Sequence, residues 1–141
     1  MKKIFFLLSA VALTFVGVAA AASDSATVRA HIPFDFTVSS FTLSAGDYTF
    51  SELSQKTWTI RNDKTDQAIY AQLVTSFGTD QDASPTSLVF KHFGSSYFLS
   101  EVHWFGGTSE ALTSKTERSM ERQMTRNHSN LHQTDVVVSA R

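Results

Sequence analysis

The chain has 141 residues, of which 42% are hydrophobic, 18% charged and 12% aromatic, and it contains no cysteine. This length allows one ordinary domain with a real core, and the aromatic content and balanced charge exclude a disordered chain. The lack of cysteine excludes disulfide scaffolds, cysteine nucleophiles, thiolate zinc sites, iron–sulfur clusters and a lipid anchor on an N-terminal Cys.

Residues 1–22 have the pattern of a secretory signal peptide. Two lysines follow the first methionine, residues 4–18 form an uncharged apolar run, and Ala20 and Ala22 place small residues before a cleavage point at Ser23. A retained membrane anchor is the alternative, but an apolar run of about 15 residues is shorter than the roughly 20 that span a bilayer. We therefore expect a secreted or periplasmic protein with no transmembrane span after cleavage.

Removing this segment changes the charge of the protein. Residues 23–141 are 119 residues with ten Lys and Arg (12 − 2) against 13 Asp and Glu, a formal charge of −3. A mildly acidic domain without a basic stripe is not expected to bind nucleic acid. An exported protein can form disulfides and this one has none, so its stability must come from its core.

Residues 27–39 carry the clearest strand pattern. Every second residue is apolar, which predicts a half-buried strand with one face turned inward. Pro33 lacks an N–H, so the strand lies at an edge there or is broken by a bulge. The apolar positions are Val28, Ala30, Ile32, Phe34, Phe36 and Val38.

Short strands and turns continue after this segment. Residues 44–47 predict a turn, and alternation resumes over residues 48–53. Residues 54–56 turn the chain again, before a short strand that carries Trp58 and Ile60.

The next segments predict an inner strand and a long loop. Residues 62–66 form a polar turn. Residues 68–75 are apolar on both faces, so we expect a central strand of the sheet. Residues 77–86 are the longest candidate loop.

Residues 87–93 and 97–105 predict a hairpin across Gly94, Ser95 and Ser96. If all three are loop residues, one face carries only apolar side chains and the other carries Lys91, Glu101 and His103, although a slip by one residue stays open. The apolar face then comprises Leu88, Phe90, Phe98, Val102 and Trp104.

The last third of the chain changes character. Ser114 and Glu117 fit a capping box at the start of a helix over residues 113–130. Met120, Met124 and Leu131 form only a thin apolar stripe, so the helix rests on the domain or projects from it.

A final strand is predicted over residues 135–139, where three valines follow one another. Coming after a helix, this strand either completes the chain's own sheet or pairs with a neighbouring molecule.

Together these elements predict an all-β fold. We expect an antiparallel sandwich or small barrel of six to eight strands over residues 23–112. One C-terminal helix covers residues 113–130, and residues 131–141 form a tail with a short terminal strand.

Five segments resemble a group of small secreted proteins common in Acidobacteria. Members show an IPFxF strand, an LPAGxY turn, a GxxYFL hairpin and an SKxER helix start, and the resemblance covers nearly all of the chain after residue 22. One departure is Ser44, where a proline is usual, which loosens the turn. The resemblance implies an envelope or extracellular address and a β-rich fold, but no activity and no catalytic residue. The segments are residues 31–36, 43–50, 88–94, 97–102 and 114–118.

No metal site or cofactor is expected. His128 and His132 have the spacing of zinc ligands on a helix but lack a third ligand nearby. A cluster of His31, His92 and His103 would need all three to converge, whereas the predicted hairpin turns two of them to opposite faces. In the long loop, Asp80 and Asp82 lack the rest of a calcium-binding pattern.

No catalytic residue is assigned either. The chain lacks a Gly-x-Ser-x-Gly motif. Glu101 or Asp35 with His103 is the one acid–base pair that can be drawn, and it supports a hydrolase only as a third alternative.

The aromatic residues supply the candidate ligand site. The simpler interpretation is a core of large side chains in place of disulfides. The alternative is a barrel interior or sheet face that holds an apolar ligand through Trp58, Tyr70, Phe90 and Trp104.

We therefore expect an exported, non-enzymatic domain of the cell envelope or extracellular space that acts by binding or assembly. Its partner through an edge strand is either a second copy or an envelope protein. A small barrel that carries an apolar ligand is the alternative function, and an uncharacterised hydrolase is the third.

Overall fold

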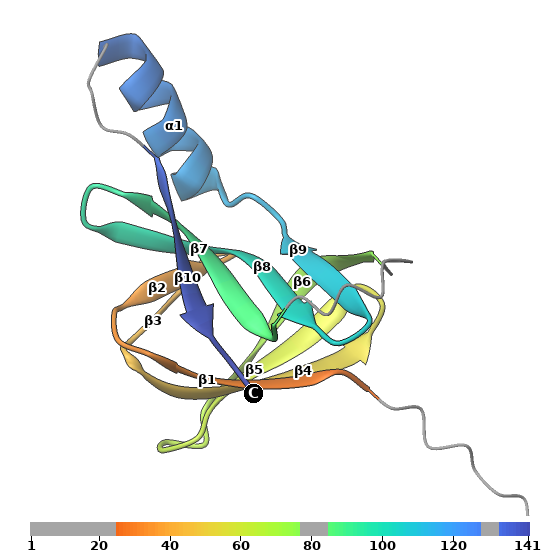
Figure 1. The fold of residues 1–141 in the computed structure, drawn as a ribbon. Helices are drawn as coiled ribbons and strands as arrows, with labels where there is room; N and C mark the ends of the chain where they lie inside the picture. The colour runs from red at the N-terminus through yellow and green to blue at the C-terminus, as the bar shows by residue number, and fades with distance from the viewer. Residues whose placement is uncertain (1–24, 77–84, 128–132) are drawn as a thin grey trace, which may run out of the picture.

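The computed structural model describes residues 25–76, 85–127 and 133–141 (Figure 1). These residues form ten strands and one helix. The elements are β1 (Thr27–Ile32), β2 (Phe36–Val38), β3 (Phe41–Leu43), β4 (Gly46–Ser54), β5 (Thr57–Asn62), β6 (Ala68–Ser76), β7 (Ser87–Phe93), β8 (Ser96–Trp104), β9 (Gly107–Ala111), α1 (Lys115–Asn127) and β10 (Thr134–Ser139).

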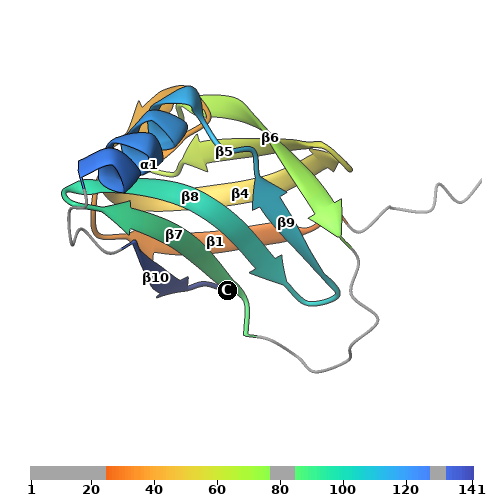
Figure 2. The same ribbon diagram turned by 90° about the horizontal axis from the view of Figure 1, so that it is seen from above.

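The strands belong to one mixed sheet. Its main path runs β1-β4-β5-β6-β9-β8-β2-β3, and β7 joins β8 to β10. The sheet curls so that β1 and β4 face β7 and β8 across one core, without closing into a barrel (Figure 2). The predicted all-β class with one C-terminal helix is confirmed. The strands number ten instead of six to eight because the first predicted strand is divided in two and because β3 and β9 carry weak sequence signals. One pair, β2 with β8, is parallel and not antiparallel as predicted.

The first predicted strand is two strands. Val28 and Ile32 of β1 are fully buried, and Phe36 and Val38 of β2 are each only 1% exposed. The predicted inward face of alternating residues is therefore confirmed. The strand is interrupted at Pro33, as its missing N–H predicts.

The β7–β8 hairpin differs from the predicted register. Its turn has two residues, and a bulge makes Ser100 the extra residue, since Val89 pairs with Glu101 while Phe90 pairs with Leu99. The bulge turns Leu99 into the core. The prediction that Phe98 shares the face of Phe90 is therefore wrong, and Phe98 packs against Phe93 on the opposite face.

The core is built from inward side chains of both sides of the curled sheet. Edge-to-face contacts join the ring of Phe36 to those of Tyr48 and Phe90. The fifteen buried members are Val28, Ala30, Ile32, Phe36, Val38, Tyr48, Phe50, Trp58, Ile60, Ala71, Leu73, Leu88, Phe90, Leu99 and Val102.

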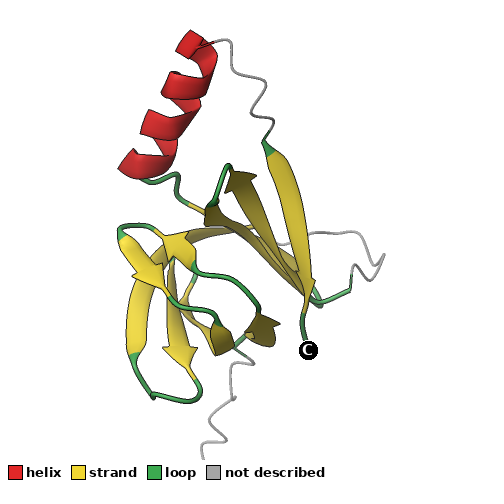
Figure 3. Cartoon of the chain, turned by 90° about the vertical axis from the view of Figure 1, so that its left-hand side faces the viewer, coloured by secondary structure: helices red, strands yellow, loops and turns green. Residues whose placement is uncertain are grey.

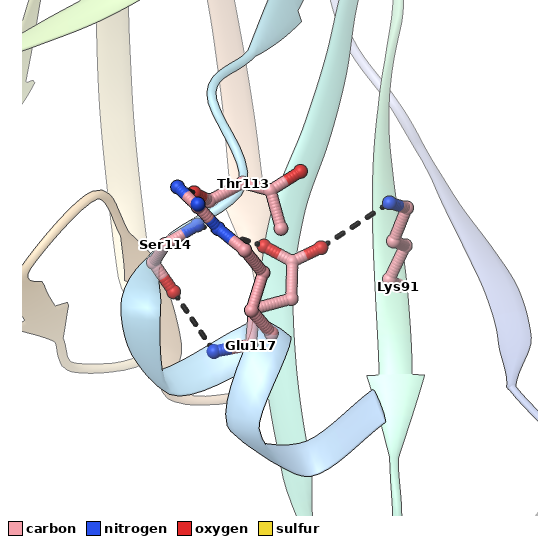
Figure 4. Close-up of polar contacts among 5 residues, drawn as sticks. Lys91, Thr113, Ser114 and Glu117 are labelled. Atoms are coloured by element: carbon pink, nitrogen blue, oxygen red, sulfur yellow. Dashed lines mark hydrogen bonds and ion pairs between the residues drawn. The ribbon is translucent and has the colours of Figure 1, made fainter. Parts of the chain in front are cut away.

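Helix α1 lies outside the sheet (Figure 3). The predicted capping box is present, because the Glu117 N–H donates to Ser114 Oγ at 3.0 Å and the Ser114 N–H donates to Glu117 Oε2 at 3.3 Å. The same carboxylate, only 6% exposed, also pairs with Lys91 Nζ of β7 at 3.2 Å (Figure 4). One buried glutamate thus starts the helix and attaches it to the strand beside β10.

No helix in the described parts of the chain is long and apolar enough to cross a membrane. Three segments with predictions lie outside the described residues. They are the expected helix end at residue 130, residues 77–84 of the expected loop, and residues 1–24.

Candidate functional site

The last strand, β10, is completed inside its own chain along one edge. It pairs antiparallel with β7 from Thr134 opposite His92 to Ser139 opposite Ser87. Val136 and Val138 are half-buried against the core, whereas Val137 faces outward and is 64% exposed. The terminal strand predicted from the valine run is therefore confirmed, with β7 as its partner.

The other edge of β10 is open along most of its length. The Ala140 N–H donates to the Thr86 carbonyl on the β7 side at 2.9 Å. Successive residues of a strand direct their backbone groups to opposite sides. The N–H and C=O groups of Asp135, Val137 and Ser139 therefore point away from β7, and no backbone partner meets them within the described residues.

Among the described residues, one backbone hydrogen-bonded pair joins this edge to β1. The Arg29 N–H donates to the Arg141 carbonyl at 2.8 Å, and the Arg141 N–H donates to the Arg29 carbonyl at 2.9 Å. In an antiparallel continuation, His31 would pair with Ser139 next. Instead both residues line a groove, so β1 and β10 diverge from one hydrogen-bonded pair.

The groove between β1 and β10 has a volume of about 640 Å³. Its aspartates already have partners, because His31 Nδ1 lies 2.8 Å from Asp47 Oδ1 and Asp63 Oδ1 accepts from Thr49 Oγ1 at 2.6 Å. Neither arginine side chain of the groove forms an ion pair with the described residues, so both are available to a carboxylate, although Asp47 and Asp63 leave the groove without a net positive charge. The lining residues are Arg29, Ala30, His31, Asp47, Asp63, Ser139, Ala140 and Arg141.

The structure does not bring the four predicted ligand residues together. Trp58 and Trp104 pack with ring centroids 5.1 Å apart, and Phe90 is fully buried beside Phe36 elsewhere in the core. Tyr70 is 67% exposed on the outer face of β6, and Val74 on the same face is 47% exposed. The prediction of an inner strand at β6 is confirmed by its pairing with β5 and β9, but its outer face meets solvent.

The predicted acid–base pair does form. Glu101 Oε2 lies 2.6 Å from His103 Nε2, and Thr108 Oγ1 lies 3.1 Å from His103 Nδ1. Glu101 and His103 share one strand face and Thr108 is directly opposite His103 on β9, so the sheet register alone accounts for the contacts. Asp35 is not part of this group, because its carboxylate accepts from the Ala45 N–H at 2.9 Å.

The histidines do not converge. His31 contacts Asp47, His92 stacks on Tyr97 with centroids 4.2 Å apart, and His103 binds Glu101. No group of three or more metal-ligating side chains occurs in the described part of the chain. The predicted zinc-like pair His128 and His132 lies outside the described residues, as do Asp80 and Asp82.

Sequence reasoning indicated the edge strands but missed the groove. The groove combines residues from β1, from the start of β4, from the turn after β5 and from the chain end. No local pattern links these segments. No known protein family, curated protein or solved structure matches this chain.

Proposed function

We propose that this protein is exported and acts as a non-enzymatic binding domain of the cell envelope or extracellular space. It takes up an extended segment of a partner protein by strand addition to the open edge of β10. The observation that carries the proposal is the set of outward backbone groups at Asp135, Val137 and Ser139, which the fold leaves without a partner in the described residues.

Strand addition suits this edge for physical reasons. An added strand gains main-chain hydrogen bonds from the three outward residues, while pockets for its side chains supply specificity. The groove beside Ser139 gives room for one side chain of the added strand at the point where β1 and β10 part. The exposed side chain of Val137 offers it an apolar neighbour.

A peptide with the sequence of residues 133–141 tests the binding step. Fluorescence anisotropy of the labelled peptide should rise with added protein and saturate. The variant Val137→Pro should bind roughly tenfold more weakly, since it lacks an outward donor and its ring blocks the edge. Failure of the peptide to bind, or equal binding by Val137→Pro, would contradict strand addition at this edge.

Export is tested separately by expressing the full chain in a bacterium with two membranes. The charged start, apolar run and small residues of the first 22 positions support cleavage before Ser23. Intact mass of the protein outside the cytoplasm should correspond to residues 23–141. Retention of the 141-residue chain in the cytoplasm would contradict export.

A further inference from the structure

The open edge of β10 has a two-fold symmetric pattern. Its three outward residues are Asp135, Val137 and Ser139, and Val137 is the middle one. In an antiparallel pair, two outward residues that lie opposite each other exchange both of their hydrogen bonds. If a second copy of β10 is related to the first by a two-fold axis beside Val137, each outward N–H and C=O of one strand therefore lies opposite an outward C=O and N–H of the other.

From this symmetry we infer that the segment added to β10 is β10 of a second copy of this chain. The inference rests on the proposed function and names its partner. In the resulting two-fold dimer, Val137 lies opposite Val137 of the second copy, and Asp135 of each copy lies opposite Ser139 of the other. Such a contact is isologous and closes at two chains.

The side chains fit this register. The exposed valines form an apolar cross-strand pair, and no like charges lie directly opposite each other. Residue 139 lines the groove, so Asp135 of the second copy enters it beside Arg29 and Arg141. These two arginines have no ion-pair partner among the described residues, and the incoming carboxylate supplies one at both ends of the dimer.

The edge also lacks most of the usual protection against self-pairing, since its one charged side chain is that of Asp135. Natural edge strands are commonly blocked by proline, inward charges, bulges or lysines. Strand β10 has none of these from Thr134 to Ser139, and its register with β7 is regular. On β1, by contrast, Pro33 follows directly after the strand. In the described part of the chain, the outward edge of β10 is therefore open to a second strand over the five residues from Asp135 to Ser139.

Sedimentation equilibrium of residues 23–141 tests the inference. The unmodified protein should show a concentration-dependent monomer–dimer equilibrium. Asp135→Arg places like charges at both ends of the contact and should weaken dimerisation roughly tenfold. The charge-swapped double variant Asp135→Arg with Arg141→Asp should dimerise more tightly than Asp135→Arg alone, whereas the control Ser40→Asp should match the unmodified protein.

A cysteine introduced into this cysteine-free chain gives a second readout. Val137→Cys should form a disulfide-linked dimer on mild oxidation, because the two residues face each other across the axis. Ser40→Cys, exposed at a distant turn, is the control. A monomer at all concentrations, or cross-linking no greater than the control, would overturn the inference. If the peptide of residues 133–141 still binds in that case, strand addition to this edge stands and only the dimer between two folded chains falls.

Discussion

Pro33 limits how far β1 can pair with β10. On β1, the backbone N–H and C=O of Arg29 point toward β10. Because backbone groups alternate along a strand, residues 31 and 33 would be the next to pair with β10. Residue 33 is proline and has no N–H to donate, and β1 ends at Ile32. Pairing with β10 could therefore not extend through residue 33, although the two strands already part at His31 and Ser139, where the groove begins.

Gly107 is required by the ring of Trp104. A Cβ at this position would lie 2.6 Å from the indole, which in turn packs against Trp58. We predict that Gly107→Ala displaces Trp104, lowers the free energy of unfolding by about 1–3 kcal/mol and changes the tryptophan fluorescence.

The matched control for this prediction is Gly94→Ala. Gly94 has a φ of +61° and nothing within 4 Å of an added Cβ, so only backbone strain of about 1–2 kcal/mol is expected. The tryptophan fluorescence of Gly94→Ala should be unchanged. Unaltered fluorescence and an unaltered denaturation midpoint in Gly107→Ala would show that the ring is not held as described.

The Lys91–Glu117 pair should respond unequally to removal of either partner. Lys91→Met leaves the Glu117 carboxylate, which is 6% exposed, without its cation. The free energy of unfolding should therefore fall by about 2–3 kcal/mol. Glu117→Gln keeps the capping oxygen and leaves Lys91, which is 26% exposed, free to turn to water, so about 1 kcal/mol is expected. Urea denaturation of both variants measures the difference, and equal losses would contradict the role of burial.

At the scale of elements, β10 should tolerate proline at one position and not at the next. The N–H of Val137 points away from β7, so Val137→Pro should lower the free energy of unfolding by no more than about 1 kcal/mol. The N–H of Val138 points toward β7, so Val138→Pro should cost about 3 kcal/mol. Thermal unfolding followed by circular dichroism compares them, and equal losses would mean that the assigned edge is wrong.

Some elements could be predicted from sequence and others could not. The alternation up to Val38, the capping box at Ser114 and the valine run of β10 each carry a local physical signal, and each is present. The bulge at Ser100 and strand β9 have no such signal, because neighbouring strands impose them. The error at Phe98 follows directly from the unseen bulge.

At the scale of the whole molecule, the sequence predicts the all-β class and the absence of disulfides. The structure confirms the all-β class, and buried aromatic and aliphatic side chains from both sides of the curled sheet meet in one cluster. The candidate site could be predicted only as an exposed edge. The groove depends on where the last residues of the chain meet β1, which is a property of the whole curled sheet and not of any one segment.

Amide hydrogen exchange along β10 tests the central claim most directly. In dilute solution, the amides of Val136 and Val138 should exchange slowly and those of Val137 and Ser139 rapidly. Raising the protein concentration, or adding the peptide of residues 133–141, should protect the two rapid amides. Protection of all four amides in dilute solution, or rapid exchange that neither treatment changes, would contradict an open edge that binds a second strand.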